Sequence, residues 1–378
     1  MNMYQIDNIK DKKRLLKELN VDSGGVSIIA DKMELLTFYI KDLKTPAVNI
    51  LKQDALSIGA ELAVPSGVII CEKPYYDCIL IGTKKHIKIL AKKELSQPFG
   101  LSLVAKELKE FIVPIASYHT QIMGIINAND DSFYSDSRFK NSNAIDKIKE
   151  MINDGADIID IGGVSSRPNA PIVSPKEELE RIKPICDVIK KEKLYKKVKF
   201  SIDSYDESVV EYALSCGFSI INDITGATND NIIKLAIKYN SKLSIMHKKG
   251  TPQNMQNNPQ YDDVMVEVSE FFSDRLDRCE ELGLSREDII LDIGVGFGKT
   301  LSHNMTLLQN LSDFKKFKCQ ILVGASRKSL IDMMSPSDIK DRLAGTITLH
   351  TKAIIDGASI IRCHDVYEHS QMRDILNY

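Results

Sequence analysis

The chain has 378 residues, of which 43% are hydrophobic and 27% charged, and its formal net charge is -2. This composition is typical of a soluble globular protein with room for more than one domain, and the net charge gives no sign of a basic surface for nucleic acid. No apolar run is long enough to span a membrane, and the N-terminus has no apolar stretch of a secretory signal. The seven cysteines include no C-x-x-C pair, so we expect a cytoplasmic protein without disulfides or a zinc site.

Residues 1–118 are predicted to form a small α/β domain, joined to the rest near residues 114–119. In chain order the pattern predicts a strand at 26–30, a helix at 47–63, strands at 68–71 and 78–81, and helices at 83–93 and 103–111. The first helix is amphipathic, which favours packing against its own sheet or the following domain. No nucleotide-binding motif is present in this part, and its role stays open.

From about residue 120 the sequence alternates between short apolar runs and segments with helical periodicity. The runs are rich in β-branched residues and lie at 122–126, 158–161, 198–202, 219–224, 243–246, 289–291, 321–323 and 359–361. Nearly continuous apolar runs are typical of parallel strands that are buried on both faces. Eight such units in about 250 residues predict a (β/α)₈ TIM barrel over residues 119–378. An open doubly wound sheet is the alternative, but no G-x-G-x-x-G follows the first strand.

Each apolar run ends in a polar residue. In order these are Asn127, Asp160, Asp203, Asn222 with Asp223, His247, Asp292, Ser326, and Arg362 with His364. Any one of them could cap the next helix. Because barrel active sites lie at the C-terminal ends of the strands, eight polar ends together predict an active site there.

The segment DIGVGFGKT at 292–300 is similar to a phosphate-binding P-loop. That motif requires glycine, four residues and then Gly-Lys-Ser/Thr, but Ile293 occupies the position of the first glycine. We therefore interpret the segment as the end of the sixth barrel strand, with Asp292 as its chemical group. Its glycines are expected to let the backbone approach a flat ring, and Lys299 and Thr300 to begin the next helix.

Eight sequence blocks in this half resemble the dihydropteroate synthase family of pterin-binding barrels. They are IMGIINANDDSF, DIIDIGGVSSRP, FSIDS, IINDITG, IMHKKGTPQNMQ, IILDIGVGFGKT, GASRKS, and RLAGT with IIRCHDV, in the family's order from residue 122 to 366. The family condenses 6-hydroxymethyl-7,8-dihydropterin diphosphate with p-aminobenzoate, giving 7,8-dihydropteroate and pyrophosphate, and uses Mg²⁺. A pterin-binding methyltransferase, or a barrel that has lost its activity, is the alternative.

The resemblance implies a pterin site at the strand ends. The residue types suit this ligand, because a pterin edge carries both donors and acceptors and ionised carboxylates accept from the donors. The pterin-binding set is Asp203, Asn222, Met246, Asp292, Phe297 and Lys328. The diphosphate would bind Asn127, Arg362 and His364, with Mg²⁺ at Asn127. The catalytic set is Asp203, Asp292, Lys328, Arg362 and His364: the carboxylates stabilise the cation left by the departing diphosphate, and no covalent intermediate is needed.

For p-aminobenzoate the resemblance implies Ser166, Arg167, Pro168 and Ser329, with Arg327 as a further candidate. Sulfonamide mimics of p-aminobenzoate are expected to compete, and a homodimer is expected. The sequence departs from the family pattern at Asn129-Asp130, Val164, Ser166 and Ile293. None of these positions belongs to the catalytic set, but their effect on loop closure stays open.

Overall fold

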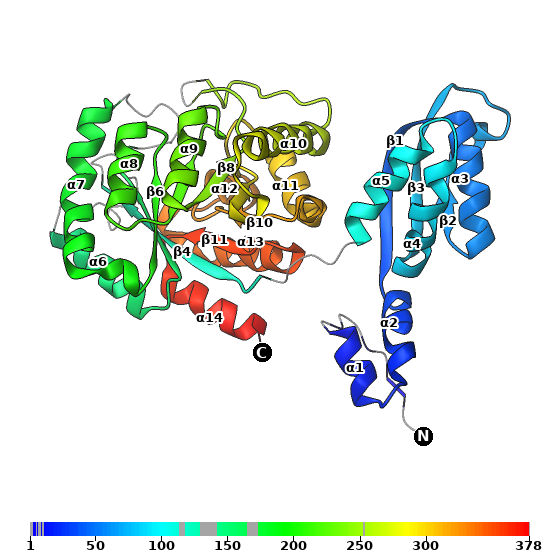
Figure 1. Cartoon of the computed structure of the whole chain (residues 1–378), viewed down its shortest axis with the longest axis horizontal. Helices are drawn as coiled ribbons and strands as arrows, with labels where there is room; N and C mark the ends of the chain where they lie inside the picture. Colours follow the sequence, from blue (N-terminus) through cyan, green and yellow to red (C-terminus); the bar gives the residue numbers. More distant parts are fainter. Residues whose placement is uncertain are drawn as a thin grey trace. The chain divides into compact units, whose positions relative to one another are not determined.

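The computed structural model describes residues 11–112, 118–128, 142–164, 173–251 and 254–377, together with Met3, Tyr4, Ile6 and Ile9. The chain divides into two compact units, Met1–Pro114 and Ile115–Tyr378, and each is described by itself (Figure 1). No described helix is long and apolar enough to cross a membrane.

The N-terminal unit is built on a small antiparallel sheet with strand order β1-β3-β2. Its elements are α1 (Lys12–Glu18), α2 (Ser23–Lys32), β1 (Leu35–Lys44), α3 (Thr45–Ile58), β2 (Glu61–Ala63), β3 (Tyr75–Thr83), α4 (Lys84–Lys93) and α5 (Leu101–Ile112). Residues of the sheet and of helices α3, α4 and α5 form its hydrophobic core, in which Leu51, Leu80 and Leu90 are fully buried. This unit therefore has a core of its own.

Three predictions in this unit are wrong. Residues 26–30 are helical because Asp22 caps α2, accepting from the Gly24 N–H at 2.9 Å, and Val26 and Ala30 are buried at helical spacing. Residues 68–71 form no strand, since only Val68 is buried there. The helix predicted at 47–63 ends at Ile58, where Gly59, with a φ of 84°, caps it and lets the chain turn into β2.

Strand β1 has no counterpart in the sequence predictions. Its residues alternate between exposed and half-buried positions up to Ile40, but Leu35 and Tyr39 on its exposed side are themselves apolar. The polar alternation that marks a one-sided strand is therefore weak. The predicted strand at 78–81 and the helices at 83–93 and 103–111 are confirmed as β3, α4 and α5.

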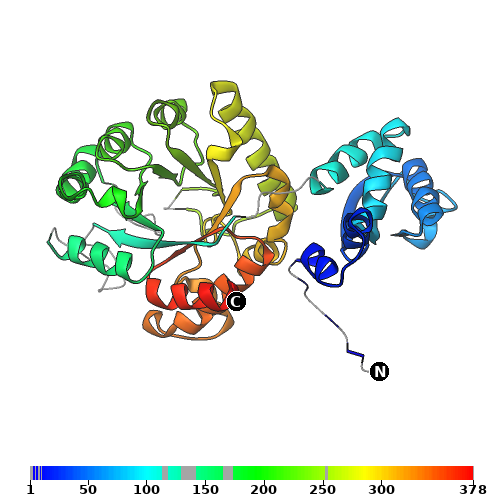
Figure 2. The ribbon, with the colours of Figure 1, turned by 60° about the horizontal axis from the view of Figure 1, so that its bottom comes forward.

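The second unit is a closed barrel of eight parallel strands surrounded by helices, which confirms the predicted fold (Figure 2). The strands are β4 (Gln121–Asn127), β5 (Ile158–Gly162), β6 (Lys199–Asp203), β7 (Ile220–Asp223), β8 (Lys242–Met246), β9 (Ile289–Asp292), β10 (Gln320–Val323) and β11 (Ile360–Cys363). The helices are α6 (Ser142–Asn153), α7 (Pro175–Glu192), α8 (Glu207–Ser215), α9 (Asp230–Tyr239), α10 (Val264–Leu282), α11 (Leu301–Gln309), α12 (Ser329–Met334), α13 (Leu343–Asp356) and α14 (Val366–Asn377).

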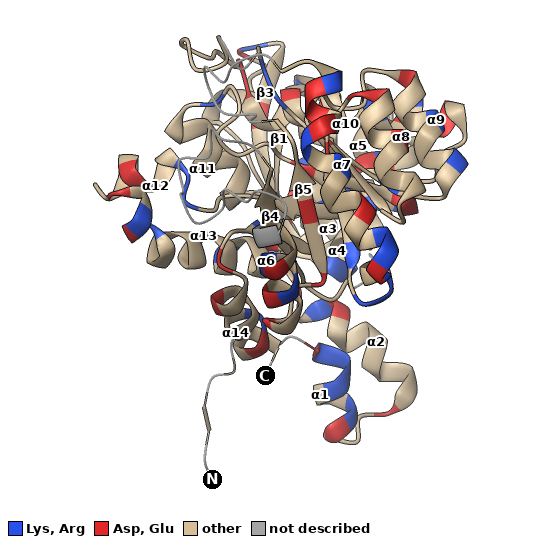
Figure 3. Ribbon diagram, turned by 90° about the vertical axis from the view of Figure 1, so that its left-hand side faces the viewer, with Lys and Arg blue, Asp and Glu red and all other residues tan. Residues whose placement is uncertain are grey.

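The barrel strands are buried on both faces, which explains their continuous apolar sequences. One large hydrophobic cluster lies between strands and helices. A separate buried cluster takes one residue from each of six strands: Met123, Ile158, Ile220, Ile290, Leu322 and Ile360. Such a layer fills the interior of the barrel and leaves its polar strand ends as the place for chemistry. On the outer helices, such as α7 and α10, both signs of charge are interspersed (Figure 3).

Candidate active site

The strand register brings predicted site residues to one level of the barrel. Asn127 pairs with Gly162, Gly162 with Asp203, and Asp203 with Asn222. On the other side Met246 pairs with Asp292. Because strand ends in register lie side by side, the side chains of Asn127, Asp203 and Asn222 start from neighbouring positions at the C-terminal end.

Arg362 joins two carboxylates at this end. Its Nε donates to Asp160 Oδ2 at 2.7 Å, and one terminal nitrogen donates to Asp203 Oδ2 at 2.8 Å. The same Asp160 oxygen also accepts from Asn222 Nδ2 at 3.1 Å. Asp160 is fully buried and its other oxygen has no hydrogen-bond partner among the described residues. The sequence marks Asp160 only as a strand-end residue and gives no sign that it holds Arg362 and Asn222.

Burial and ion pairing oppose each other in this cluster. Burial raises the pKa of Asp203 to about 7, and the nearby Arg362 counteracts that rise. Burial acts to lower the pKa of Arg362, but Asp160 and Asp203 outweigh it and raise that pKa. The arginine therefore stays charged, while Asp203 can exchange a proton near neutral pH.

Asp292 and Lys328 form a second pair of charged groups. Asp292 Oδ1 accepts from the Gly294 N–H at 2.8 Å, and burial raises its pKa while Lys328 acts to lower it. Burial lowers the pKa of Lys328 to about 8, and Asp292 opposes that change. The Lys328 ammonium donates to the Val295 carbonyl and lies 4.7 Å from the centre of the Phe297 ring. Lys328 therefore lies over the glycine loop that follows β9.

Lys299 has a structural role that the sequence does not reveal. It is 3% exposed, and its ammonium donates to the carbonyls of His247, Gly294 and Phe297 at 3.1, 3.0 and 3.1 Å. Burial lowers its pKa to about 7. Three carbonyls around one ammonium fasten the glycine loop to the end of β8. As expected, Thr300 begins the next helix, capping α11 through the His303 N–H at 3.2 Å.

The glycines of this loop are required by close approach within the chain itself. Gly294 and Gly298 have φ values of 63° and 62°. A Cβ at Gly294 would overlap the carbonyl oxygen of His247, and one at Gly298 would overlap that of Lys249. Gly296 differs, since the nearest atom to its Cβ would be Lys328 Cδ at 3.5 Å. Of these three glycines, only Gly296 has space beside it, so the expectation that a glycine lets the backbone approach a flat ring applies to Gly296 alone.

The loops after β10 and β11 are bound to each other. Ser326 Oγ lies 2.9 Å from His364 Nδ1. Arg327 makes a two-pronged ion pair with Asp365 at 3.0 and 2.7 Å and also donates to the carbonyls of Ile339 and Lys340. Arg327 is 8% exposed, so its guanidinium is engaged in holding these loops together.

The predicted p-aminobenzoate residues are only partly described. Ser329 is exposed and begins α12. Ser166, Arg167 and Pro168 lie outside the described residues, as does Asn129-Asp130. Met246 is 3% exposed at the end of β8, and Phe297 is half-buried.

For Mg²⁺ the described residues offer an amide oxygen. No group of three or more histidine, cysteine or carboxylate side chains gathers there as a metal site. Asn127 is half-buried at the end of β4. Mg²⁺ usually keeps several waters and takes few protein ligands besides substrate phosphates. An amide oxygen at this strand end fits that pattern when a diphosphate supplies the remaining ligands.

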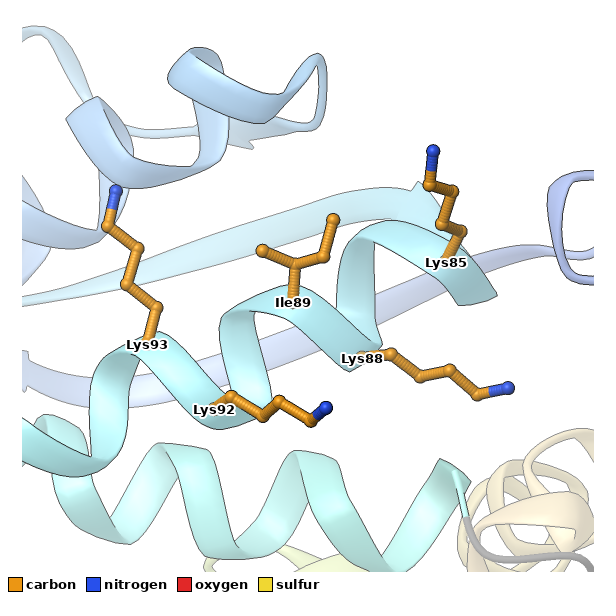
Figure 4. Close-up of a pocket in the computed structure, with 5 residues that line it drawn as sticks. All are labelled: Lys85, Lys88, Ile89, Lys92 and Lys93. Atoms are coloured by element: carbon orange, nitrogen blue, oxygen red, sulfur yellow. The ribbon is translucent and has the colours of Figure 1, made fainter. Parts of the chain in front are cut away.

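In the N-terminal unit, cationic side chains gather on α4. Lys85, Lys88, Ile89, Lys92 and Lys93 line a shallow hollow of about 480 Å³ (Figure 4). Two of the lysines have acidic partners within the unit: Lys88 lies 2.5 Å from Asp31, and Lys93 lies 2.8 Å from Asp54. The hollow is therefore a partly neutralised surface of the helix.

Comparison with known proteins gives the class of the barrel. A family model described as pterin binding enzyme matches residues 123–364. The barrel is also similar to the crystal structure of Yersinia pestis dihydropteroate synthase in complex with a sulfonamide drug. That match has a TM-score of 0.65 and 36% identity, and it covers 68% of this chain and 94% of the other. The molecule is thus a pterin-binding barrel enzyme.

Two relatives identify the family more closely. Dihydropteroate synthase of Escherichia coli K12 is 41% identical over 253 residues, which is 66% of this chain and 88% of that protein. A bifunctional dihydropteroate synthase/dihydropteroate reductase of Helicobacter pylori is 40% identical over 367 residues, covering 94% of this chain and 96% of that protein. The chain belongs to the dihydropteroate synthase family, which confirms the resemblance in the sequence.

Proposed function

We propose that the strand ends of the barrel catalyse the condensation of 6-hydroxymethyl-7,8-dihydropterin diphosphate with p-aminobenzoate. The observation that carries this proposal is the pairing of the half-buried Arg362 with Asp160 and Asp203 near the Asp292–Lys328 pair. Both a cation and an anion form in this reaction, and a site with fixed charges of both signs can stabilise the two at once.

The pterin would bind by its polar edge. Asp203 and Asp292 accept from ring N–H and amine donors, and Lys328 donates to the carbonyl and ring-nitrogen side. Because Asn222 Nδ2 already donates to Asp160, Asn222 would present its carbonyl oxygen to a donor of the pterin. Met246 and Phe297 offer polarizable surfaces for the ring faces.

The reaction breaks one bond and forms another. The C–O bond between the pterin methylene and the diphosphate breaks, and the diphosphate leaves with the electron pair. Arg362 and His364 hold its oxygens, and Mg²⁺ at Asn127 would neutralise part of its charge. Asp203 and Asp292 stabilise the cation in the ring. The p-aminobenzoate nitrogen then forms the C–N bond and releases a proton to solvent.

The second substrate is proposed to bind beside Ser329 and the segment Ser166, Arg167 and Pro168. Sulfonamides, which mimic p-aminobenzoate, are expected to compete there, and we propose a homodimer as the assembly. Competition appears as a higher KM for p-aminobenzoate at unchanged kcat, and sedimentation gives the assembly state.

The experiment that tests this function uses the full chain with the dihydropterin diphosphate, p-aminobenzoate and Mg²⁺. Chromatography should detect 7,8-dihydropteroate together with an equal amount of pyrophosphate. The absence of dihydropteroate would contradict the synthase proposal. Pyrophosphate released without dihydropteroate would indicate hydrolysis of the substrate, and the absence of both products would support an inactive pterin-binding barrel. Transfer of a methyl group from a methylated pterin to an added corrinoid would support the methyltransferase alternative.

We also propose a dihydropteroate reductase activity. The observation in its favour is coverage: the bifunctional Helicobacter pylori relative matches along 94% of this chain, whereas the Escherichia coli synthase matches along 66%. The N-terminal unit is therefore shared with the relative that carries the second activity. Reduction of 7,8-dihydropteroate would place a hydride on C6 and a proton on N5.

The reductase proposal needs a two-electron donor, which in biology is a reduced nicotinamide or flavin nucleotide. The full chain would be incubated with 7,8-dihydropteroate and each of these donors in turn. Donor-dependent formation of tetrahydropteroate supports the proposal. Unchanged dihydropteroate with every donor contradicts it, without bearing on the synthase reaction.

A further inference from the structure

Two histidines lie buried in direct contact in the helical layer of the barrel. His350 comes from α13 and His369 from α14, and both are fully buried. His350 Nδ1 lies 2.8 Å from His369 Nε2. The hydrogen bonds described for these two side chains go to each other and to the backbone of Ala325 and Asp365, and the proposed reaction assigns neither histidine a role.

The outer contacts of the pair determine where its protons are. The Ala325 backbone N–H donates to His350 Nε2 at 2.9 Å, so this nitrogen carries no proton and a neutral His350 is protonated on Nδ1. That Nδ1–H donates to His369 Nε2. His369 is then protonated on its own Nδ1, which lies 2.5 Å from the Asp365 carbonyl oxygen. All three hydrogen bonds run in one direction, from Ala325 to Asp365.

The environment favours this neutral arrangement. Burial, and next the neighbouring His369, lower the pKa of His350 far below its usual value. Burial also lowers the pKa of His369. A proton added to His350 Nε2 would face the Ala325 N–H, and one added to His369 Nε2 would face the Nδ1–H of His350. Either change would leave two donors opposed in a buried place.

This series of hydrogen bonds begins and ends on the two loops that carry proposed catalytic residues. Ala325 follows β10 and precedes Lys328 by three positions, and Asp365 directly follows His364. The same loops are joined by Ser326 with His364 and by Arg327 with Asp365. The hydrogen bonds of His350 and His369 add a further link between these loops, which runs through α13 and α14.

We propose that His350 and His369 are positioning residues, which hold the β10 and β11 loops at a fixed separation and so set where Lys328 and His364 meet the substrate. The proposal rests on the roles proposed for these two residues. A misplacement of about 1 Å can cost about a hundredfold in rate, and sites are accurate when a supporting layer of hydrogen bonds fixes them.

The test compares four full-length variants with the wild type: His350→Ala, His350→Gln, His369→Ala and Ile189→Ala. A glutamine can accept from Ala325 and donate to His369 at once, so it can replace both ends of the link. Ile189 is a fully buried residue of α7. It serves as the control for lost stability, because α7 lies beside α6 and α8 and not beside α13 or α14. Each variant is measured for thermal unfolding, kcat, and KM for both substrates.

His350→Ala and His369→Ala should lower kcat by roughly tenfold or more in protein that circular dichroism shows to be folded. His350→Gln should recover most of the rate, and Ile189→Ala should keep the wild-type kcat despite a lower unfolding temperature. Wild-type kcat and KM in folded His350→Ala and His369→Ala would overturn the proposal. If both alanine variants fail to fold, His350→Leu, which keeps much of the buried volume but makes none of these hydrogen bonds, replaces them. A lower kcat in folded His350→Leu supports the link, and a wild-type kcat contradicts it.

A spectroscopic measurement tests the direction of these hydrogen bonds without any catalytic turnover. The ¹⁵N resonances of the imidazoles in the wild type should show both histidines protonated on Nδ1 and bare on Nε2. Protonation of His350 on Nε2 would contradict the link to Ala325. Because this readout needs no substrate, a failure of the proposed synthase function stays distinguishable from a failure of the positioning proposal.

Discussion

The barrel and the N-terminal unit differ in the charged side chains that they bury and in the groups around those side chains. The barrel buries Asp160, Asp292 and Lys299 at the ends of its strands, where charged groups of opposite sign or backbone carbonyls surround them. Among the described residues of the N-terminal unit, Glu94 is the one charged side chain that is buried. Burial, and next Asp54, raise its pKa to about 7. Arranged opposite charges therefore distinguish the region with the proposed chemistry.

The largest effect that sharpens this comparison is expected from charge removal in the barrel. Asp292→Asn and Arg362→Ala should each lower kcat by roughly a hundredfold or more, because each removes a charge that stabilises one of the separating ions. Glu94→Gln, which removes the buried acid of the other unit, should leave the synthase rate unchanged. Steady-state kinetics with both substrates measures all three variants. Near wild-type rates for Asp292→Asn and Arg362→Ala would show that the site is misassigned.

A second contrast concerns two glycines with positive φ, one from each region. Gly294→Ala should destabilise the barrel by about 3 kcal/mol or more, because its Cβ would overlap the His247 carbonyl in addition to the backbone strain. Gly59→Ala should cost only about 1 kcal/mol, since the nearest atoms to its Cβ, in His86, are 4.0 Å away. Urea unfolding gives both values. Equal losses would mean that the loop after β9 yields to the added atom.

The last of these effects is a pH dependence of kcat/KM for the synthase reaction, which is proposed to take place in the barrel. Asp203 must be ionised to accept from the pterin, and its pKa is raised to about 7, so kcat/KM should fall as the pH drops below that value. Lys328 must be protonated, and its pKa is lowered to about 8, so kcat/KM should also fall above that value. The loss should approach tenfold per pH unit on each side. A constant kcat/KM between pH 5 and 7 would contradict the assignment of Asp203.

The sequence predicts the barrel far better than the N-terminal sheet, for a physical reason. Barrel strands such as β5 are buried along their whole length, so their sequences are continuously apolar and easily recognised. Strand β1 has the apolar residues Leu35 and Tyr39 among its exposed positions, and its pattern does not separate it from other apolar runs. The segment 26–30 is too short for periodicity alone to distinguish strand from helix.

The candidate site shows the same division. Asp203 and Asp292 could be predicted because each ends a strand, and Asn222 because it lies one residue before the end of β7; a barrel brings all strand ends together. The partners of Asp160, Lys299 and the His350–His369 pair could not, because they depend on contacts between residues far apart in the sequence. A lysine after three glycines predicts a phosphate loop as readily as the buried ammonium that the structure has.

The central claim is that the barrel separates a pterin cation from diphosphate before the amine attacks. It can be tested with dihydropterin diphosphate that carries ¹⁸O in the bridge to the methylene, bound to the wild-type protein with Mg²⁺ and with p-nitrobenzoate, which has no amine to attack, in place of p-aminobenzoate. If the C–O bond breaks and re-forms in the site, the label should move from the bridging to the non-bridging oxygens, and Asp292→Asn should slow this exchange. A label that stays in the bridge, in protein that turns over with p-aminobenzoate, would contradict the claim.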